Sequence, residues 1–184
     1  MGEEPRPGNV YLVEERRPRV SYDLFDKALG SGFEGLVVTR DFPKKVAAER
    51  GLASSRMLWL TNLVGEGRVN PTAIGILMNH LRTFIEGRPK SVIMLDGLEY
   101  LVSLNTYDRM LQFMHQLRDI VITNNALLFV PVDPKTLTER ELALLERNLE
   151  PVVTGTGSEE EQPHGEEMIE VDNGEIKLLP VRNR

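Results

Sequence analysis

The chain has 184 residues, of which 41% are hydrophobic and 27% charged, as expected for one soluble domain with a sizeable core. It has no cysteine, which excludes disulfides, thiolate catalysis and Cys-based zinc sites. The polar start lacks an apolar signal segment, and no run approaches the roughly 18 apolar residues that span a bilayer. We therefore expect a cytoplasmic protein without membrane insertion.

The net charge of −6 is unevenly distributed along the chain. Residues 158–184 hold eight acidic and three basic residues, so this segment alone carries a net charge of −5. The remaining chain is nearly neutral and shows no basic stripe. This pattern argues against a nucleic-acid partner, because such proteins carry a clustered positive surface.

Five short apolar runs predict strands at residues 10–13, 35–39, 57–61, 92–95 and 126–132. The runs mostly lack alternation, which is typical of strands buried on both faces. Helical patterns lie between them, and their predicted cap residues are Ser21, Asp41, Asn70, Asn105 and Thr138. Strands that alternate with helices predict an α/β fold: a mostly parallel five-stranded sheet with helices on both faces.

The C-terminal region is predicted to be separate from this core domain, which covers residues 1–154. Residues 155–167 read as a flexible acidic linker, and residues 168–184 as a β-hairpin extension. Asn173-Gly174 is a strong two-residue turn signal, and its register pairs Val171 with Ile176. Two strands alone cannot bury an apolar face in water, so we expect the hairpin to pack on its own body or on another chain.

The segment at residues 91–101, S-V-I-M-L-D-G-L-E-Y-L, contains the leading candidate site residues. Asp96 ends a buried strand, Gly97 permits close approach, and Glu99 adds a second carboxylate. Ligands of open α/β sheets bind beyond the carboxyl ends of the strands, so this pair can hold a divalent ion. The favoured alternative is structural, with Asp96 capping a short turn after the strand.

The partner motif of a phosphate-binding site is missing, because none of the 15 glycines is followed by lysine. Arg40, at the end of the second predicted strand, either contacts a phosphate or carboxylate or, as we favour, forms a surface ion pair. The three histidines lack metal-ligand spacing, and no nucleophile elbow is present. We therefore expect no catalytic residues, metal site or cofactor, and identify no small-molecule substrate.

The order of several motifs resembles a largely archaeal family, domain of unknown function 835. The matching pieces are G-N-V-Y-L-V-E-E (8–15), S-Y-D-L-F (21–25), G-L-V-V-T-R-D-F-P (35–43), M-L-W-L-T (57–61), L-D-G-L-E-Y-L (95–101) and V-D-P (132–134). The resemblance implies a RecA-like core of degenerate P-loop type that lacks the phosphate loop. It brings no established active site, and it implies an interaction or regulatory role in signalling.

Two hypotheses follow for the function. The first is a non-catalytic protein-interaction or regulatory module in archaeal signalling or cell organisation, with a protein partner or self-association. The second is a nucleotide- or metal-binding enzyme of RecA-like type that uses Asp96 and Glu99.

Overall fold

The computed structural model describes residues 4–53, 55–152, 169–172 and 175–178. The chain divides into two compact units, Met1–Thr154 and Gly155–Arg184. Unit one contains β1 (Asn9–Glu14), α1 (Val20–Gly30), β2 (Glu34–Thr39), α2 (Pro43–Arg50), β3 (Arg56–Leu60), β4 (Arg68–Val69), α3 (Ile74–Glu86), β5 (Ser91–Asp96), α4 (Leu98–Leu104), α5 (Tyr107–Thr123), β6 (Leu127–Val132), η1 (Pro134–Thr136), α6 (Glu139–Glu146) and β7 (Glu150–Val152). No helix in the described part of the chain is long and apolar enough to cross a membrane.

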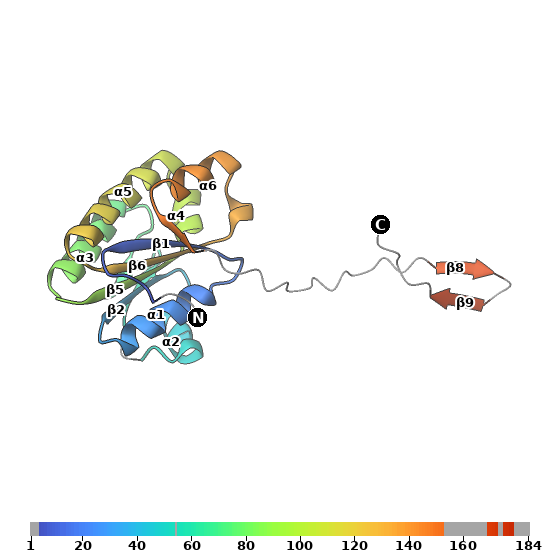
Figure 1. The fold of residues 1–184 in the computed structure, drawn as a ribbon, viewed down its shortest axis with the longest axis horizontal. Coiled ribbons are helices and arrows are strands. Elements are labelled where there is room, and N and C mark those ends of the chain that lie inside the picture. Colours follow the sequence, from blue (N-terminus) through green and yellow to red (C-terminus); the bar gives the residue numbers. More distant parts are fainter. Residues whose placement is uncertain (1–3, 54, 153–168, 173–174, 179–184) are drawn as a thin grey trace. The chain divides into compact units, whose positions relative to one another are not determined.

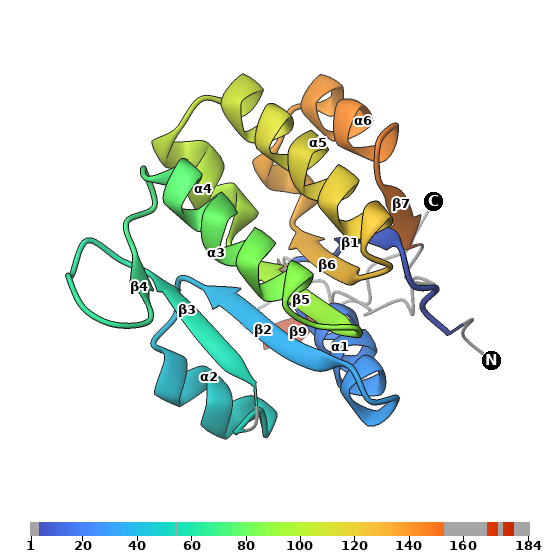
Figure 2. The same ribbon diagram turned by 90° about the vertical axis from the view of Figure 1, so that its left-hand side faces the viewer.

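The first unit is an α/β domain built on a single parallel sheet in the order β4-β3-β2-β5-β6-β1-β7. Helices α1 and α2 lie on one face, and α3, α4, α5 and α6 lie on the other (Figures 1 and 2). Alternate strand residues supply two separate cores, so that Val37 and Met94 face α1 while Val38 and Leu95 face the larger helical layer. Both faces of the central strands are therefore covered, as continuous apolar runs require.

The sheet has seven strands, so the prediction of five was wrong. The five predicted strands are present, but β4 and β7 were missed. Both form the outer edges of the sheet and have only two and three residues. Pro151 lies in β7, which is possible because an edge strand can tolerate a missing N–H. Such short segments carry no hydrophobic pattern of their own.

Several predicted helix starts were also displaced. Ser21 lies inside α1, and the first amides of this helix donate instead to the Glu15 carboxylate. Helix α2 has Phe42 at its N-cap position and receives no cap from Asp41. Asn70 closes a local turn by accepting from the Thr72 N–H, while Thr106, not Asn105, caps α5. The predicted cap at Thr138 is confirmed, and it forms a capping box with Glu141 at the start of α6.

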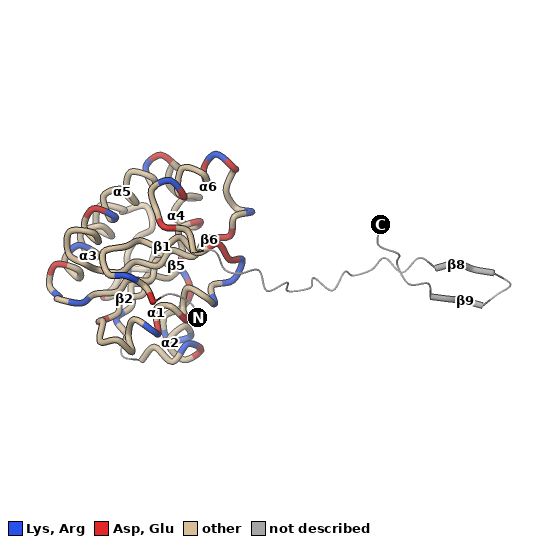
Figure 3. Tube along the Cα trace, in the orientation of Figure 1, with Lys and Arg blue, Asp and Glu red and all other residues tan. Residues whose placement is uncertain are grey.

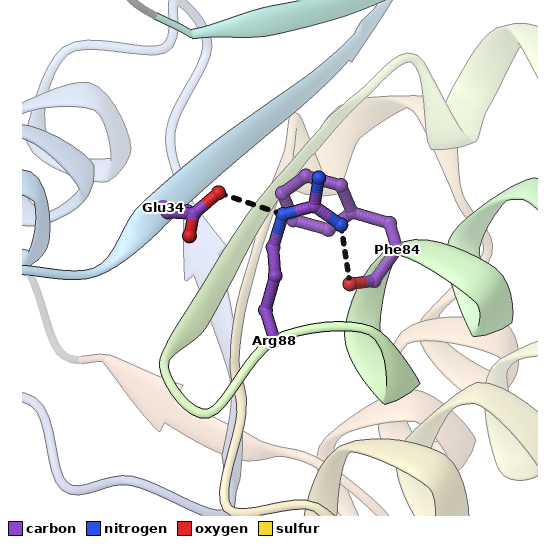
Figure 4. A network of polar contacts seen from close by, with 3 residues as sticks. All are labelled: Glu34, Phe84 and Arg88. Atoms are coloured by element: carbon purple, nitrogen blue, oxygen red, sulfur yellow. Dashed lines mark hydrogen bonds and ion pairs between the residues drawn. The ribbon is translucent and has the colours of Figure 1, made fainter.

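The turn between α3 and β5 is held to the neighbouring strand by Arg88 (Figure 4). Its Nε donates to Glu34 Oε2 over 2.8 Å, and its Nη1 donates to the Phe84 carbonyl over 3.1 Å. The guanidinium also lies 4.1 Å from the centre of the Phe84 ring. These contacts fasten the amino ends of β2 and β5 together, while the opposite ends remain open for a site.

In the second unit, β8 (Ile169–Asp172) and β9 (Glu175–Leu178) form an antiparallel pair. Val171 lies opposite Ile176 and Ile169 opposite Leu178, which is the register predicted from the Asn-Gly sequence. The turn residues, the linker at 155–167 and the packing of the hairpin side chains lie outside the described residues.

Gly35 sets how closely α1 approaches the sheet. A Cβ there would lie 2.7 Å from Phe25 Cζ and 2.8 Å from Leu29 Cδ2, both on α1. We expect Gly35→Ala to lower the free energy of unfolding by about 1–3 kcal/mol through overpacking. Gly75→Ala is the matched control, because nothing lies within 4 Å of its added Cβ in α3. It should raise stability by up to about 1 kcal/mol. Urea unfolding followed by circular dichroism measures both values, and equal effects would contradict this account of α1 packing.

Candidate functional site

The sheet reverses its direction of winding between β2 and β5. The chain leaves β2 through α2 toward β3, whereas it leaves β5 through α4 and α5 on the other face toward β6. The carboxyl ends of these adjacent strands therefore separate into a crevice, where open α/β sheets usually bind ligands. Thr39 and Asp96 are direct neighbours in the register and form its floor.

A pocket of about 350 Å³ lies in this crevice, and we call it the switch pocket. It is lined by three residues that follow β2 and by five from the end of β5 and α4: Thr39, Arg40, Asp41, Asp96, Gly97, Glu99, Tyr100 and Ser103. The three candidates taken from the sequence, Arg40, Asp96 and Glu99, therefore lie around one pocket.

Gly97 carries the chain from β5 into α4 in a backbone conformation that favours glycine. Its φ of 150° is a conformation that side-chain-bearing residues rarely adopt. A Cβ there would also lie 3.2 Å from Leu60 Cδ1 and 3.9 Å from the Arg40 amide nitrogen. Gly97 thus lets the start of α4 pass close to the main chain that leaves β2.

Asp96 does not cap α4, so the favoured structural interpretation was wrong in its details. The N-cap of α4 is Gly97, without a side-chain cap. Instead, Asp96 Oδ2 accepts a hydrogen bond of 2.8 Å from the hydroxyl of buried Tyr22 on α1. Arg50, at the end of α2, lies 4.5 Å from the centre of the same Tyr22 ring. Asp96 therefore joins β5 to the helical layer formed by α1 and α2.

Burial raises the pKa of Asp96 to about 6, and the nearby charges of Asp41 and Glu99 contribute to the rise. The Tyr22 hydrogen bond and Arg50 act in the opposite direction but do not restore the ordinary value. Burial and the adjacent Asp96 charge also raise the pKa of Tyr22 far above its usual range, so Tyr22 stays a hydrogen-bond donor.

Glu99 is directed toward the next strand. Its Oε1 accepts a hydrogen bond of 2.7 Å from the amide of Asp133, immediately after β6. Asp133 in turn accepts from the Lys135 amide and begins η1. Glu99 thus fixes the chain that leaves β6, and its second carboxylate oxygen makes no hydrogen bond to the described residues.

Arg40 makes no ion pair with any acid in the described ranges, so the favoured surface ion pair is not found. Its guanidinium lies 4.3 Å from the centre of the Tyr100 ring, and both residues line the pocket. Thr39 Oγ1 accepts from the Asp41 amide and fixes the turn that carries Arg40. A stacked guanidinium without an acidic partner remains available to an anionic or polar group.

Sequence reasoning missed Tyr22, Tyr100 and Ser103 as residues of the site. Tyr22 lies in the family-matching piece S-Y-D-L-F and Tyr100 in L-D-G-L-E-Y-L. Membership of these pieces was the one sequence feature that could have indicated the two tyrosines. Among the residues that the structure describes, no three His, Asp or Glu side chains form a group that could hold a metal ion.

An α/β domain with an all-parallel sheet and a polar pocket at its winding reversal is a common class of ligand-binding or regulatory domain. Within this class, the chain belongs to the family described as Protein of unknown function (DUF835), whose sequence model matches residues 14–149. The matched range includes every residue that lines the switch pocket. None of the curated proteins compared with the chain matches it significantly.

The raised pKa of Asp96 predicts how stability depends on pH. Because the folded-state pKa is about 6 and the ordinary value is 3.8, the folded state retains a proton that the unfolded chain has lost. Protonated Asp96 therefore contributes about 3 kcal/mol to the free energy of unfolding relative to the ionised group. This contribution is fully present below pH 4 and is lost as the pH rises through 6. Asp96→Asn should lack this loss and should be at least as stable as the wild type at pH 7.5.

Chemical unfolding of both proteins between pH 4 and pH 8 provides the measurement. The difference in unfolding free energy between the variant and the wild type isolates Asp96, because the other titrating groups are the same in both proteins. A variant that is less stable than the wild type at pH 7.5 by more than about 1 kcal/mol would show that ionised Asp96 is stabilised in the fold.

Proposed function

We propose that this protein is a non-catalytic interaction and regulatory module that acts through protein contacts in an archaeal signalling or cell-organisation complex in the cytoplasm. The family resemblance supports a RecA-like core that has lost its phosphate loop. The parallel sheet, the helices on both faces and the acid at the end of central strand β5 are compatible with such a core. The family itself carries no known activity, so the argument rests on the residues of this chain.

The observation that carries the proposal is a group of exposed apolar side chains beside the switch pocket. Phe42 is 50% exposed, Leu63 57% and Val64 95%, and all three lie in loops at the carboxyl edge of the sheet. Contacts through Trp59 and Arg68 link Phe42 to the loop that contains Val64. Exposed apolar side chains that gather in one place usually mark a contact surface.

A second observation supports a non-catalytic role. Asp96 and Glu99, the acids that a magnesium-dependent site would use, both accept hydrogen bonds from other parts of the fold. The chain also lacks a Gly-Lys pair, so no phosphate-loop lysine is present to stabilise charge on a transferred phosphoryl group.

The alternative function is a nucleotide- or metal-binding enzyme of RecA-like type that uses Asp96 and Glu99. It is supported by the position of both acids in one pocket with Arg40, whose guanidinium has no acidic partner among the described residues. Each carboxylate also keeps an oxygen that makes no hydrogen bond to the described chain.

We expect no steady hydrolysis of ATP or GTP by the purified full-length chain with magnesium. Phosphate release measured against a blank without protein tests this expectation. Turnover that disappears in Asp96→Asn, while Ile122→Asn retains it, would contradict the non-catalytic proposal and favour the alternative. Ile122 is a suitable control because it is 41% exposed on α5 and does not line the pocket.

The interaction role itself is tested by two measurements on the full chain. Sedimentation equilibrium reports self-association, and chemical crosslinking in cells of the source organism, followed by mass spectrometry, reports partners and their contact residues. We expect specific crosslinks to the first unit. A chain that remains monomeric and gives no specific crosslink would contradict the proposal.

A further inference from the structure

One surface of the first unit combines exposed apolar side chains with two arginines that each lie over an aromatic ring. We call it the Trp59 surface, and it consists of Arg40, Phe42, Trp59, Leu63, Val64 and Arg68. These residues come from the turn between β2 and α2, from β3, from the loop between β3 and β4, and from the first residue of β4. Figure 2 shows these elements at the β4 edge of the sheet.

The aromatic and arginine side chains of this surface are held in place by contacts within the fold. The Phe42 ring packs edge-on against Trp59 at 5.4 Å, and the Arg68 guanidinium lies 5.5 Å from the Trp59 ring centre. Trp59 Nε1 donates to the Arg40 carbonyl over 2.9 Å, and Arg68 Nη1 donates to the Val64 carbonyl over 3.1 Å. Binding therefore requires little ordering of these groups, which lowers its entropic cost. Trp and Arg are also enriched among the residues that dominate interface energies.

The charge of this region is opposite to that of the whole chain. Residues 40–69 contain six basic and three acidic residues, a net charge of +3, whereas the chain carries −6. Arg40, Lys44 and Arg68 form no ion pair with an acid in the part of the chain that the structure describes. Figure 3 shows the Lys and Arg positions of α2 in blue. A partner of complementary charge would therefore be acidic.

We propose that the Trp59 surface binds an acidic peptide segment of a partner protein, anchored by apolar side chains on Phe42, Leu63 and Val64. This inference rests on the proposed interaction function and names its contact surface and partner chemistry. The exposed Leu63 and Val64 favour a peptide over a nucleic acid, because aliphatic side chains offer neither charge for phosphates nor a ring for base stacking.

A random peptide-display selection against the immobilised full-length chain tests the proposal and requires no identified partner. We expect enrichment of peptides that combine several Asp or Glu residues with Leu, Val or aromatic residues. Fluorescence anisotropy of one labelled, enriched peptide then gives its dissociation constant, which should rise with salt because the contact is partly electrostatic.

Two surface variants assign the contact to this part of the molecule. Val64→Asp places a repelling charge among the apolar anchors, and Arg68→Gln removes a cation, so each should weaken peptide binding by about tenfold. Ile122→Asp is the matched control, since it also places a charge at an exposed apolar position but lies on α5. It should bind the peptide like the wild type. Thermal unfolding by circular dichroism verifies that each variant is folded.

Three results would overturn the inference. The first is a selection that enriches no peptides, or only peptides without acidic residues. The second is an unchanged peptide affinity in folded Val64→Asp and Arg68→Gln. The third is a single-stranded DNA oligonucleotide that binds this surface more tightly than the peptide does. Self-association that Val64→Asp abolishes, without peptide binding, would assign the surface to a second copy of the chain. In each case the interaction function would still be judged by its own crosslinks and sedimentation, so the two failures are distinguishable.

Discussion

The carboxylates at the end of β5 hold together parts of the chain that are far apart in sequence. Asp96 receives a hydrogen bond from Tyr22, 74 residues earlier, and Glu99 receives one from the Asp133 amide, 34 residues later. One bond reaches the helices on one face of the sheet, and the other fixes the exit from β6. Because α1 begins on the Glu15 carboxylate, the ends of β1, β5 and β6 are all set by acids at this edge.

This arrangement bears directly on function. An acid after a buried strand is the part of a phosphate-handling site that carries the metal, but these two acids already bond to protein donors. Asp96 is also largely buried, and this burial raises its pKa to about 6. Below about pH 6 a proton on Asp96 would therefore compete with any cation for this carboxylate. The Arg40 guanidinium stacks on Tyr100 at the pocket and has no acidic partner among the described residues, so its donors are available to an anionic or polar group.

The sequence predicted the central strands because a strand buried on both faces must be apolar along its whole length. It did not predict β4 and β7, since these edge strands depend on hydrogen bonds to strands that are already formed. The candidate residues followed from a general rule, that ligands bind beyond the carboxyl ends of parallel strands, which indicated Asp96 and Glu99 as a pair and Arg40 separately. That all three line one pocket was not predicted. The partners of these residues did not follow, because the contact of Tyr22 with Asp96 depends on strand order, and periodicity does not specify strand order.

The switch pocket and the Trp59 surface share one residue, and this joins the two into a single region. The Arg40 guanidinium stacks on Tyr100 at the pocket, while the Arg40 carbonyl accepts the indole N–H of Trp59. A partner that shifts Trp59 must either break this hydrogen bond or move the main chain at Arg40. Thr39, fixed beside Asp96 in the sheet, limits that movement to the residues after β2. Contact at the exposed edge and occupancy of the pocket would therefore act on the same short turn, which would give the proposed regulatory role a physical basis.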